Sequence, residues 1–395
     1  MSAFKPPLSR VMPPLVVGCA GFSKQFHFDP LNMPYVDIVR RAIELDIAAF
    51  DTSPYYGPSE ILLGEALKTL NPPRNKCFLI TKVGRIASNE FDYTPSWVRY
   101  SVYRSLERLG TSYLDLVYTH DAEFVSPAEV LAAVTELRRL RDEGVIRYVG
   151  ISGYPIETLA SLAEMILQET GEPLDAVMSY SHLCVQNTQL ARPDILRRFK
   201  NAQVNCIPTA SILSMGLLTT RGVNAGPQNT WHPAPPGLRK ACHDLVPIVQ
   251  AEGMRMEDVC VRWALQTWGR IGAPFGSHAY NLTNGTSLSS RRLGIVVMGV
   301  AQVGDLEENY ATWKSAVAGA TGMDQASVEQ AKDVDKLVTE KLIPSLGEWK
   351  DFTWASPEKG FVNLRLAPGQ IPVDDISIRK GLVHIPVNTM ERPKI

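Results

Sequence analysis

The chain lacks a long apolar run. Nowhere in its 395 residues do about 18 apolar side chains follow one another, the length that a membrane-spanning helix requires. The N-terminal stretch MSAFKPPLSRVMPPL is broken by prolines and basic residues, so it also lacks the apolar core of a secretory signal peptide. We therefore expect a soluble, cytoplasmic protein with no membrane partner.

An excess of charge of either sign is missing too. Lys and Arg number 40 against 41 Asp and Glu, a formal net charge of −1 with neutral histidines. A general nucleic-acid binder carries a clear basic excess, so we expect no nucleic-acid partner. Apolar residues make up 45% of the chain, which is enough for a sizeable core and indicates a globular protein.

Cysteine is scarce and scattered. The six cysteines form no Cys-x-x-Cys or Cys/His spacing, so we expect them to be reduced and buried. None of the seven histidines makes a His-x-His or His-Glu-x-x-His pair, so no metal site is expected. Gly-x-Gly-x-x-Gly after a strand and Gly-x4-Gly-Lys-Ser/Thr are also absent, which disfavours the Rossmann and P-loop folds.

What the chain has instead is an alternation of short apolar runs with stretches of helical period. Eight runs are candidate strands, and short connections through helices indicate parallel strands with right-handed crossovers. Eight such units favour an α/β fold of the (β/α)8 TIM barrel type over an open doubly wound sheet. The candidate strands are Leu15–Gly18, Ile47–Asp51, Cys77–Lys82, Tyr113–Thr119, Val145–Ser152, Asp175–Tyr180, Val204–Pro208 and Gly294–Met298.

Helix ends are marked in the sequence. Thr94 before Pro95 is an N-cap signal, and Gly110 closes the apolar stripe that follows. Ser126 and Glu129 have the spacing of a capping box and open the next helix. Both helices therefore have predicted starting points.

Two segments are not accounted for by the eight βα units. Residues 269–293 are rich in Gly, Ser and Asn and read as a loop inserted before strand eight. Beyond the barrel of residues 1–320, a predicted helix at 324–342 leads into a tail that contains Trp349, Phe352 and Trp354. Because large aromatic side chains are usually buried against other parts of a protein, we expect residues 321–395 to form a C-terminal helix and tail docked on the barrel.

Chemically versatile side chains lie at three consecutive strand ends. Strand two ends at Asp51 and continues to Tyr55 and Tyr56, strand three ends at Lys82, and strand four ends at His120. The chemistry of a βα barrel sits at this end of the strands. Each residue alone has an ordinary structural interpretation, but together they place an acid, a phenol, an ammonium and an imidazole at one mouth.

This set suits proton transfer to or from an oxygen while a hydride moves at the attached carbon. We expect Lys82 to lower the pKa of a neighbouring phenol and Asp51 to fix and partly neutralise Lys82. His120 is expected to donate a hydrogen bond to a substrate oxygen. The residues alone do not decide between Tyr55 and Tyr56.

The chain resembles the aldo-keto reductase superfamily over roughly residues 15–318. The resemblance rests on Phe50-Asp51-Thr-Ser-x-x-Tyr56-Gly, Thr81-Lys82, the strand Tyr113 to His120, and Leu217-Leu-Thr. It implies a TIM barrel and an NAD(P)-dependent oxidoreductase. It also implies a catalytic tetrad, which here is Asp51, Tyr56, Lys82 and His120, with Tyr56 chosen over Tyr55 by the spacing of the family.

The departures from the family pattern are similar to those of its L-galactose dehydrogenase and D-arabinose 1-dehydrogenase branch, and the long tail is reminiscent of fungal members. Ser152 remains a carboxamide contact, whereas Gly153 stands where the family has Asn. The family's Gln aligns with Val177 and its stacking aromatic with Ala210. This branch oxidises aldoses at C1 to lactones.

The resemblance also implies a cofactor site. A helix start after strand eight would supply backbone N–H groups to the pyrophosphate-ribose end. The family's basic residue for a 2′-phosphate falls at Asp305, so we expect NAD to be preferred, with NADP possible if Arg291 or Arg292 supplies charge; Asp305 is otherwise a helix N-terminal acid. The full set of expected cofactor contacts is Ser152, Gly153, Ser211, Leu213, Gly216, Gly299, Val300, Gln302, Asp305, Glu308 and Asn309.

Four loop residues are expected to wall a substrate pocket, with packing within the loops as the alternative: Phe22, Tyr55, His182 and Trp231. The leading functional hypothesis is an aldose 1-dehydrogenase. A carbonyl reductase of a larger aldehyde or ketone is the second, and a nicotinamide-binding regulatory subunit with little turnover is the third. A monomer is the default expectation.

Overall fold

A computed structural model describes residues 5–278 and 292–383, and shows a closed barrel of eight parallel strands in the order β1 to β8. The predicted TIM barrel is thus confirmed. β8 pairs with β1, with Leu15 opposite Val296, which closes the sheet. The strands are β1 (Leu15–Gly18), β2 (Ala49–Asp51), β3 (Phe78–Val83), β4 (Leu114–His120), β5 (Ile146–Gly153), β6 (Ala176–Tyr180), β7 (Thr209–Ala210) and β8 (Val296–Gly299).

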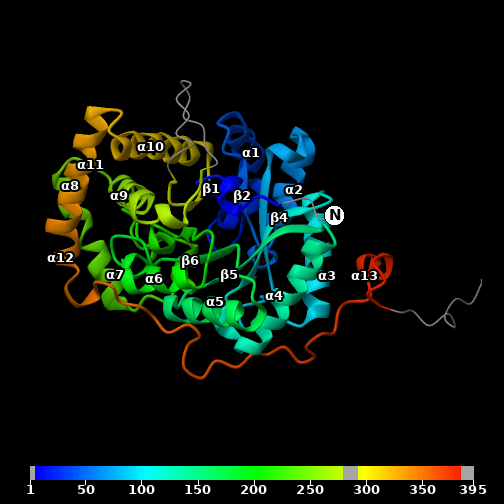
Figure 1. Ribbon diagram of the computed structural model, residues 1–395. Helices are drawn as coiled ribbons and strands as arrows, with labels where there is room; N and C mark the ends of the chain where they lie inside the picture. Colours follow the sequence, from blue (N-terminus) through cyan, green and yellow to red (C-terminus); the bar gives the residue numbers. More distant parts are fainter. Residues whose placement is uncertain (1–4, 279–291, 384–395) are drawn as a thin grey trace, which may run out of the picture.

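Helices surround the barrel, and the C-terminal segment runs beneath α6, α5 and α4 to end beside α3 (Figure 1). They are α1 (Tyr35–Glu44), α2 (Ser59–Leu70), α3 (Pro95–Leu109), α4 (Pro127–Asp142), α5 (Ile156–Thr170), α6 (Pro193–Asn201), α7 (Pro236–His243), α8 (Val246–Ala251), α9 (Met256–Ile271), α10 (Val303–Thr321), α11 (Gln325–Leu337), α12 (Ile343–Ser345) and α13 (Asp375–Arg379).

The two predicted helix starts are confirmed. The Thr94 side chain accepts from the N–H of Trp97, and Gly110 ends α3 with a left-handed φ of 63°. Ser126 and Glu129 form a complete capping box at α4. Local side-chain chemistry therefore fixes both helix boundaries.

Strand seven differs from the prediction. Residues 204–208 run alongside the start of β6 and exchange hydrogen bonds with it through Cys206, but only Thr209–Ala210 pairs regularly with both neighbouring strands. Pro208 interrupts the segment because it has no N–H to donate. The predicted strand at 204–208 was therefore several residues too early.

The segment predicted as a loop insertion begins later than expected. Helix α9 continues to Ile271, past the predicted start at 269. The N–H of Ser277 and the carbonyl of Leu293, and the reverse pair, join the two ends of the excursion at 2.8 and 2.9 Å. Residues 279–291, which include Arg291, lie outside the described part of the chain.

Two apolar clusters hold the fold together. One lies between the sheet and the helices, and the other fills the barrel interior with Ile80, Leu116 and Tyr118 among its members. Leu8 and Met12, from the segment before β1, belong to the interior cluster and are fully buried. The amino-terminal end of the barrel is thus plugged, while the other end carries the polar side chains.

All six cysteines are free and buried, as predicted. Burial raises the pKa of Cys206 to about 12. These thiols therefore behave as apolar packing groups.

Candidate active site

Strand alternation places three polar side chains at the open mouth of the barrel. Ala49, Ile80 and Tyr118 face the barrel interior. The side-chain period of a strand is two, so the inward positions two residues further along are Asp51, Lys82 and His120. All three are less than 9% exposed, although the apolar interior lies directly below them.

Asp51 and Lys82 form a buried ion pair. Lys82 Nζ lies 2.5 Å from Asp51 Oδ1 and donates to the Thr52 carbonyl at 2.9 Å. Burial alone would lower the pKa of Lys82, but the charge of Asp51 and the nearby Tyr56 raise it. Burial also raises the pKa of Asp51, and Lys82 works against that rise. With the ammonium this close, we treat the two groups as charged.

Tyr56 lies beside this ion pair. A short 3₁₀ turn at Pro54–Tyr56 follows β2, and the Lys82 ammonium lies 4.8 Å from the centre of the Tyr56 ring. Burial of the phenol raises the pKa of Tyr56, and Lys82 opposes this without overcoming it. The expectation that Lys82 lowers the pKa of this phenol below its ordinary value is therefore wrong for the protein alone, because desolvation outweighs the ammonium.

Tyr55 faces a different cation. Its hydroxyl oxygen accepts from Arg85 Nη2 at 3.0 Å, and the Arg85 guanidinium lies 3.8 Å from the centre of its ring. The structure thus separates two adjacent tyrosines that the residues alone left equivalent: Tyr56 packs against Lys82, and Tyr55 packs against Arg85.

His120 contacts both tyrosines. Its ring meets the Tyr56 ring edge-on at 5.6 Å and the Tyr55 ring at 5.8 Å. Burial lowers the pKa of His120 to about 3, so the imidazole is neutral across the physiological range. A neutral imidazole can donate one hydrogen bond to a substrate oxygen.

Arg85 and Asp121 were missed by the sequence analysis. They form an ion pair near the Nε2 side of His120, and Asp121 has a left-handed backbone with φ 56°. Burial acts to raise the pKa of Asp121, but its charged neighbours lower it overall. The available signal was position: Asp121 follows the strand-end histidine, and Arg85 follows the strand-end lysine by three residues.

The four expected pocket residues fall into two groups. Phe22 and His182 are buried, Phe22 in the outer apolar cluster and His182 against Tyr154 with ring centres 4.4 Å apart. Both side chains are therefore packed against other residues of the protein. Tyr55 and Trp231 are partly exposed, and Trp231 packs edge-on against Phe26 of the loop after β1 at 5.2 Å.

The tail reaches the same rim. Trp354 stacks on Tyr154, which follows β5, with ring centres 4.5 Å apart, and meets His232 edge-on at 5.6 Å. Ser356 donates to Glu123 Oε1, after β4, at 2.7 Å. These contacts place Trp354 beside the loops at the mouth, a role that sequence spacing gave no means to assign.

Further hydrogen bonds extend this attachment. Gln186, after β6, donates to the Trp349 and Phe352 carbonyls at 2.9 and 3.1 Å. Asn363 pairs with the backbone of Phe91, after β3, at 3.0 and 2.8 Å. The tail is therefore attached to loops that follow β3, β4, β5 and β6.

Ser152 faces the barrel interior next to Met178. The two residues pair across β5 and β6, and Met178 belongs to the interior cluster, whereas Val177 belongs to the outer one. The interior position beside Ser152 is therefore Met178, whereas Val177, where we expect the family's Gln to align, packs in the outer cluster.

Gly153 has a steric reason to be glycine. A Cβ atom at this position would lie 2.3 Å from Glu123 Oε2, closer than any real contact allows. Glu123 is itself fixed, because its other oxygen accepts from the N–H of Tyr154 at 3.1 Å. The Glu123 carboxyl therefore excludes an Asn side chain at 153.

The loop after β7 contains the expected contacts Ser211, Leu213 and Gly216, all partly exposed. Ser211 has φ 54° and Gly216 has φ 101°, and Ser214 and Met215 between them are also left-handed. Such backbone is uncommon outside functional segments. The loop therefore presents its backbone in an unusual form beside the mouth.

The segment after β8 contains the remaining expected cofactor contacts. Gly299, Gln302 and Glu308 are exposed, Asn309 and Asp305 are partly exposed, and Val300 is buried. Space around the Cα of Gly299 is open, since an added Cβ would meet nothing within 4 Å. Such an opening beside a helix start fits the ribose-phosphate end of an extended dinucleotide.

Asp305 caps helix α10. Its Oδ2 accepts from the N–H groups of Ala301 and Gln302 at 2.9 and 3.2 Å, and its Oδ1 accepts from the Gln302 amide at 3.0 Å. Two of the backbone N–H groups that were expected to bind the pyrophosphate therefore already donate to the Asp305 carboxylate. Arg292 precedes β8 and donates to the Asn205 and Gly276 carbonyls at 2.9 Å, so it is engaged at the opposite end of the barrel.

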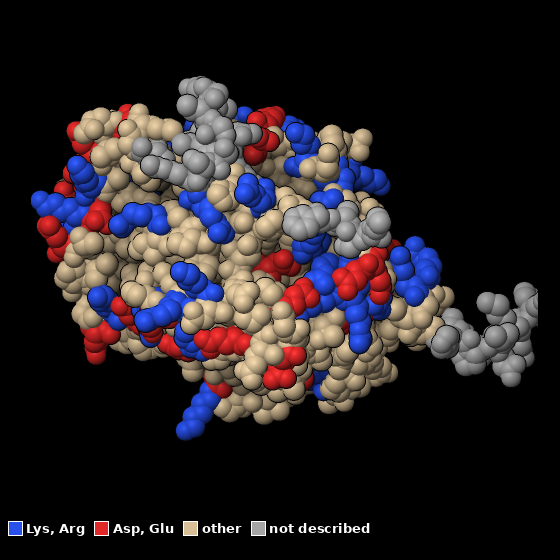
Figure 2. Space-filling view, in the orientation of Figure 1, with Lys and Arg blue, Asp and Glu red and all other residues tan. Residues whose placement is uncertain are grey.

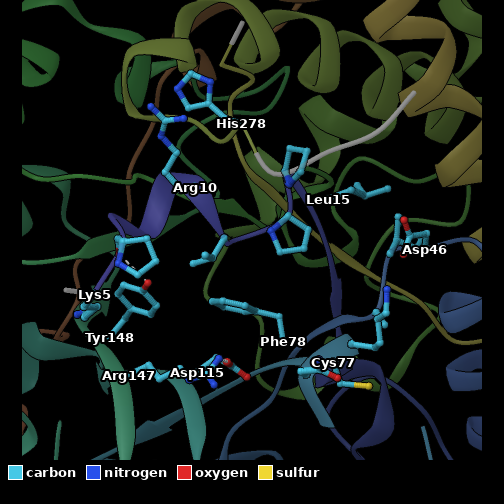
Figure 3. A pocket seen from close by; sticks show the side chains of 18 of the residues that line it. Lys5, Arg10, Leu15, Asp46, Cys77, Phe78, Asp115, Arg147, Tyr148 and His278 are labelled. Atoms are coloured by element: carbon cyan, nitrogen blue, oxygen red, sulfur yellow. Dashed lines mark hydrogen bonds and ion pairs between the residues drawn. The ribbon is translucent and has the colours of Figure 1, made fainter. Parts of the chain in front are cut away.

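A hollow of about 1040 Å³ opens at the amino-terminal ends of the strands, away from the tetrad (Figure 3). Its lining includes Lys5, which pairs with Asp175, and Arg147, which pairs with Asp115. None of the predicted site residues lines it. It is therefore separate from the candidate active site.

The surface carries mixed charge, with basic and acidic side chains interspersed on the visible face (Figure 2). Within residues 5–278 and 292–383, no cluster of three His, Cys, Asp or Glu side chains is arranged to hold a metal ion. None of the described helices is long and apolar enough to cross a membrane.

The geometry defines a class. A (β/α)8 barrel whose strands two to four bring an acid, a phenol, an ammonium and an imidazole to one mouth is suited to proton transfer at a substrate oxygen. A sequence model of the Aldo/keto reductase family matches residues 14–320. The chain belongs to this family and is an NAD(P)-dependent oxidoreductase, as its motifs predicted.

Curated relatives point to the same branch. The chain is 43% identical over 261 residues to D-arabinose 1-dehydrogenase of Saccharomyces cerevisiae, covering 65% of this chain and 76% of that protein. It is 32% identical over 313 residues to L-galactose dehydrogenase of Arabidopsis thaliana, covering 78% and 86%. The predicted resemblance to this branch is confirmed.

Solved structures support the fold. An aldo-keto reductase from Bacillus halodurans in its holo form superposes with a TM-score of 0.53 at 19% identity, covering 82% of this chain and 91% of that one. A glycerol dehydrogenase from Gluconobacter oxydans gives 0.53 at 21% identity, covering 85% and 95%.

Proposed function

We propose that this protein oxidises an aldose at C1 to a lactone, with NAD as the preferred cofactor and Tyr56 as the proton-transfer residue. The observation that carries the proposal is the convergence of Tyr56, Lys82 and His120 at one mouth, with Lys82 4.8 Å from the Tyr56 ring. The relatives named as dehydrogenases of D-arabinose and L-galactose indicate the substrate class.

Tyr56 transfers the proton. In oxidation it accepts the proton of the C1 hydroxyl, and in reduction it returns a proton to the carbonyl oxygen. Lys82, held by Asp51 at 2.5 Å, stabilises the phenolate form during that transfer. His120 donates a hydrogen bond to the same substrate oxygen and orients it.

A bound nicotinamide would accept the hydride that leaves C1 of the aldose. Ser152 and Gly153 are proposed to hold its carboxamide, beside Met178 on the neighbouring strand, and Ser211, Leu213 and Gly216 are proposed as further contacts. The segment Gly299–Asn309 would hold the adenosine end. The contacts fit a dinucleotide, with fewer side-chain amides than the family pattern has.

Asp305 supports the preference for NAD. A 2′-phosphate near this carboxylate would be repelled, and two N–H groups that could bind it already donate to Asp305. Arg292 does not supply the missing positive charge for a 2′-phosphate, because its guanidinium donates to backbone carbonyls at the opposite end of the barrel.

The substrate pocket is proposed to be walled by Tyr55, Trp231 and the tail residue Trp354. Tyr55 is fixed by Arg85, and Trp354 is fixed by stacking on Tyr154. Aromatic faces of this kind pack against the C–H faces of a sugar ring, while polar groups take its hydroxyls.

Initial rates with NAD and NADP against D-arabinose, L-galactose and a set of aromatic aldehydes test the proposal. Turnover of aldoses with NAD is expected, with lactone as product. Turnover of bulky carbonyls alone would replace the proposal with a reductase, and tight cofactor binding without turnover would replace it with a regulatory subunit.

A further inference from the structure

A buried serine contacts the back of the candidate catalytic histidine. Ser53 Oγ lies 3.0 Å from His120 Nδ1, and Ser53 is fully buried. The same hydroxyl oxygen accepts from the N–H of Tyr55 at 3.1 Å. Ser53 therefore has two nitrogen neighbours and one hydrogen of its own.

Counting hydrogens distinguishes the two neutral forms of His120. If the hydrogen were on Nδ1, Ser53 would accept from both Tyr55 and His120, and its own hydrogen would have no acceptor recorded among the described residues. Burying an unpaired hydroxyl hydrogen costs about 1–3 kcal/mol. If the hydrogen is on Nε2, Ser53 donates to Nδ1 and accepts from Tyr55, so the Ser53 hydroxyl and His120 Nδ1 are both satisfied.

Asp121 gives a second, independent argument. Its Oδ2 lies 3.8 Å from His120 Nε2, on the side of the ring opposite Ser53. The carboxylate is held there by Arg85 and by the left-handed backbone at Asp121. A negative charge on this side favours the tautomer with hydrogen on Nε2.

The ring is also fixed in position. Tyr93 donates from its hydroxyl to the His120 carbonyl at 2.6 Å, and His120 pairs with Ser152 across the sheet. The charged and titratable side chains that face His120 are Lys82, Arg85, Asp121, Tyr55 and Tyr56. Burial, together with the two cations, disfavours a second proton on the imidazole, and Asp121 opposes this effect without overcoming it. The choice is therefore between the two neutral tautomers.

We infer that Ser53 is a positioning residue that holds His120 as the Nε2–H tautomer, so that the imidazole can only donate toward the mouth of the barrel. The catalytic consequence rests on the proposed function, whereas the tautomer itself does not. His120 then binds a substrate oxygen as a fixed donor and takes no proton from it. Proton transfer falls to Tyr56 alone.

The tautomer can be read directly in the full-length parent protein. Two-bond ¹H–¹⁵N spectra of a sample labelled with ¹⁵N-histidine distinguish a protonated ring nitrogen from an unprotonated one, and His120→Gln identifies the His120 signals by their loss. We expect Nε2 to be protonated and Nδ1 unprotonated, unchanged between about pH 6 and pH 9. A protonated Nδ1 would overturn the inference.

Two variants test Ser53 itself. Ser53→Ala removes the donor, and Ser53→Thr keeps it in an extended backbone (φ −164°) that suits a β-branched residue. We expect Ser53→Ala to give mixed His120 tautomers and about a tenfold loss of kcat, the equivalent of one hydrogen bond of about 1.4 kcal/mol. Ser53→Thr should restore both.

The outcomes separate the two proposals. If Ser53→Ala loses activity while His120 keeps hydrogen only on Nε2, Ser53 is merely structural and the inference fails. If Ser53→Ala does not fold, the spectrum of the parent protein still decides the tautomer. If the spectra agree but no aldose is turned over, the proposed function fails and the assignment at His120 stands.

Discussion

Lys82 Nζ lies 2.5 Å from Oδ1 of Asp51, and both side chains are almost completely buried. A buried charge pair of this kind adds little net stability, because desolvation offsets much of its attraction. Its value is local: it holds an ammonium against the Tyr56 ring in a place that water scarcely reaches.

Tyr56→Phe should abolish most turnover, with kcat falling about 10²–10⁴-fold because the proton-transfer group is lost. NAD affinity, measured by quenching of tryptophan fluorescence, should change little. Tyr55→Phe is the matched control, since the neighbouring ring contacts Arg85 and not Lys82. A larger loss in Tyr55→Phe than in Tyr56→Phe would reverse the assignment.

The pH dependence should follow Tyr56 alone. Because the pKa of Tyr56 is raised by burial, the phenolate needed for oxidation becomes more populated as pH rises, so the rate of oxidation should increase through the alkaline range. Reduction uses the protonated phenol and should stay level at neutral pH.

Protonation of His120 should not affect that pH profile near the ordinary pKa of a histidine, because burial lowers the pKa of His120 to about 3. The profile of kcat/KM between about pH 5.5 and 8 checks this. A limb in that range that disappears in His120→Gln would show that the imidazole titrates after all.

Asp305→Asn should narrow the preference for NAD over NADP while keeping the helix cap, because an amide oxygen still accepts from the N–H groups of Ala301 and Gln302. We expect the ratio of kcat/KM values to change by about tenfold toward NADP. Asp305→Ala should show a similar change and in addition lose about 0.5–2 kcal/mol of stability with the cap. Unchanged cofactor ratios in both variants would refute the charge argument.

Gly153→Asn should be strongly destabilising, because a Cβ would lie 2.3 Å from Glu123 Oε2. We expect a loss of about 1–3 kcal/mol, typical of overpacking, measured by urea unfolding. Combining it with Glu123→Ala should relieve the clash. The double variant should then lose less stability than the sum of the losses in the two single variants. Additive losses would show that Glu123 is not the obstacle.

Trp354→Ala should raise KM for the sugar and lower Tm. It removes a stacked pair with Tyr154 at 4.5 Å, worth about 0.5–1.5 kcal/mol beyond buried area. Leu366→Ala on the same tail is the control, because Leu366 is 99% exposed and should have no effect on either quantity. Equal KM values in the two variants would show that Trp354 does not line the substrate pocket.

Features set by local chemistry could be predicted from the sequence. Thr94 and Ser126 mark helix starts with their own side chains, and the strand period brings Asp51, Lys82 and His120 to one face. Features set by tertiary contact could not. The direction in which Tyr55 and Tyr56 face depends on where Arg85 and Lys82 lie, and the rise in the pKa of Tyr56 depends on its burial.

The face of the sheet to which a strand residue belongs also depends on neighbouring strands. Val177 and Met178 are both apolar, so nothing local says which of them faces the interior of the barrel until the pairing of Met178 with Ser152 is known. Pro208 ends regular pairing within a segment whose composition is otherwise that of a strand. In both cases neighbouring strands supplied the missing information.

The C-terminal tail bears on the order in which the molecule is completed during synthesis. Asp51, Tyr56, Lys82 and His120 leave the ribosome within the first third of the chain, but Trp354 and Ser356, which contact Tyr154 and Glu123 at the rim, leave near the end. A nascent chain thus has its chemical groups long before it has the wall that surrounds them. On the proposed function, the part of the substrate pocket that the tail supplies is therefore the last to form.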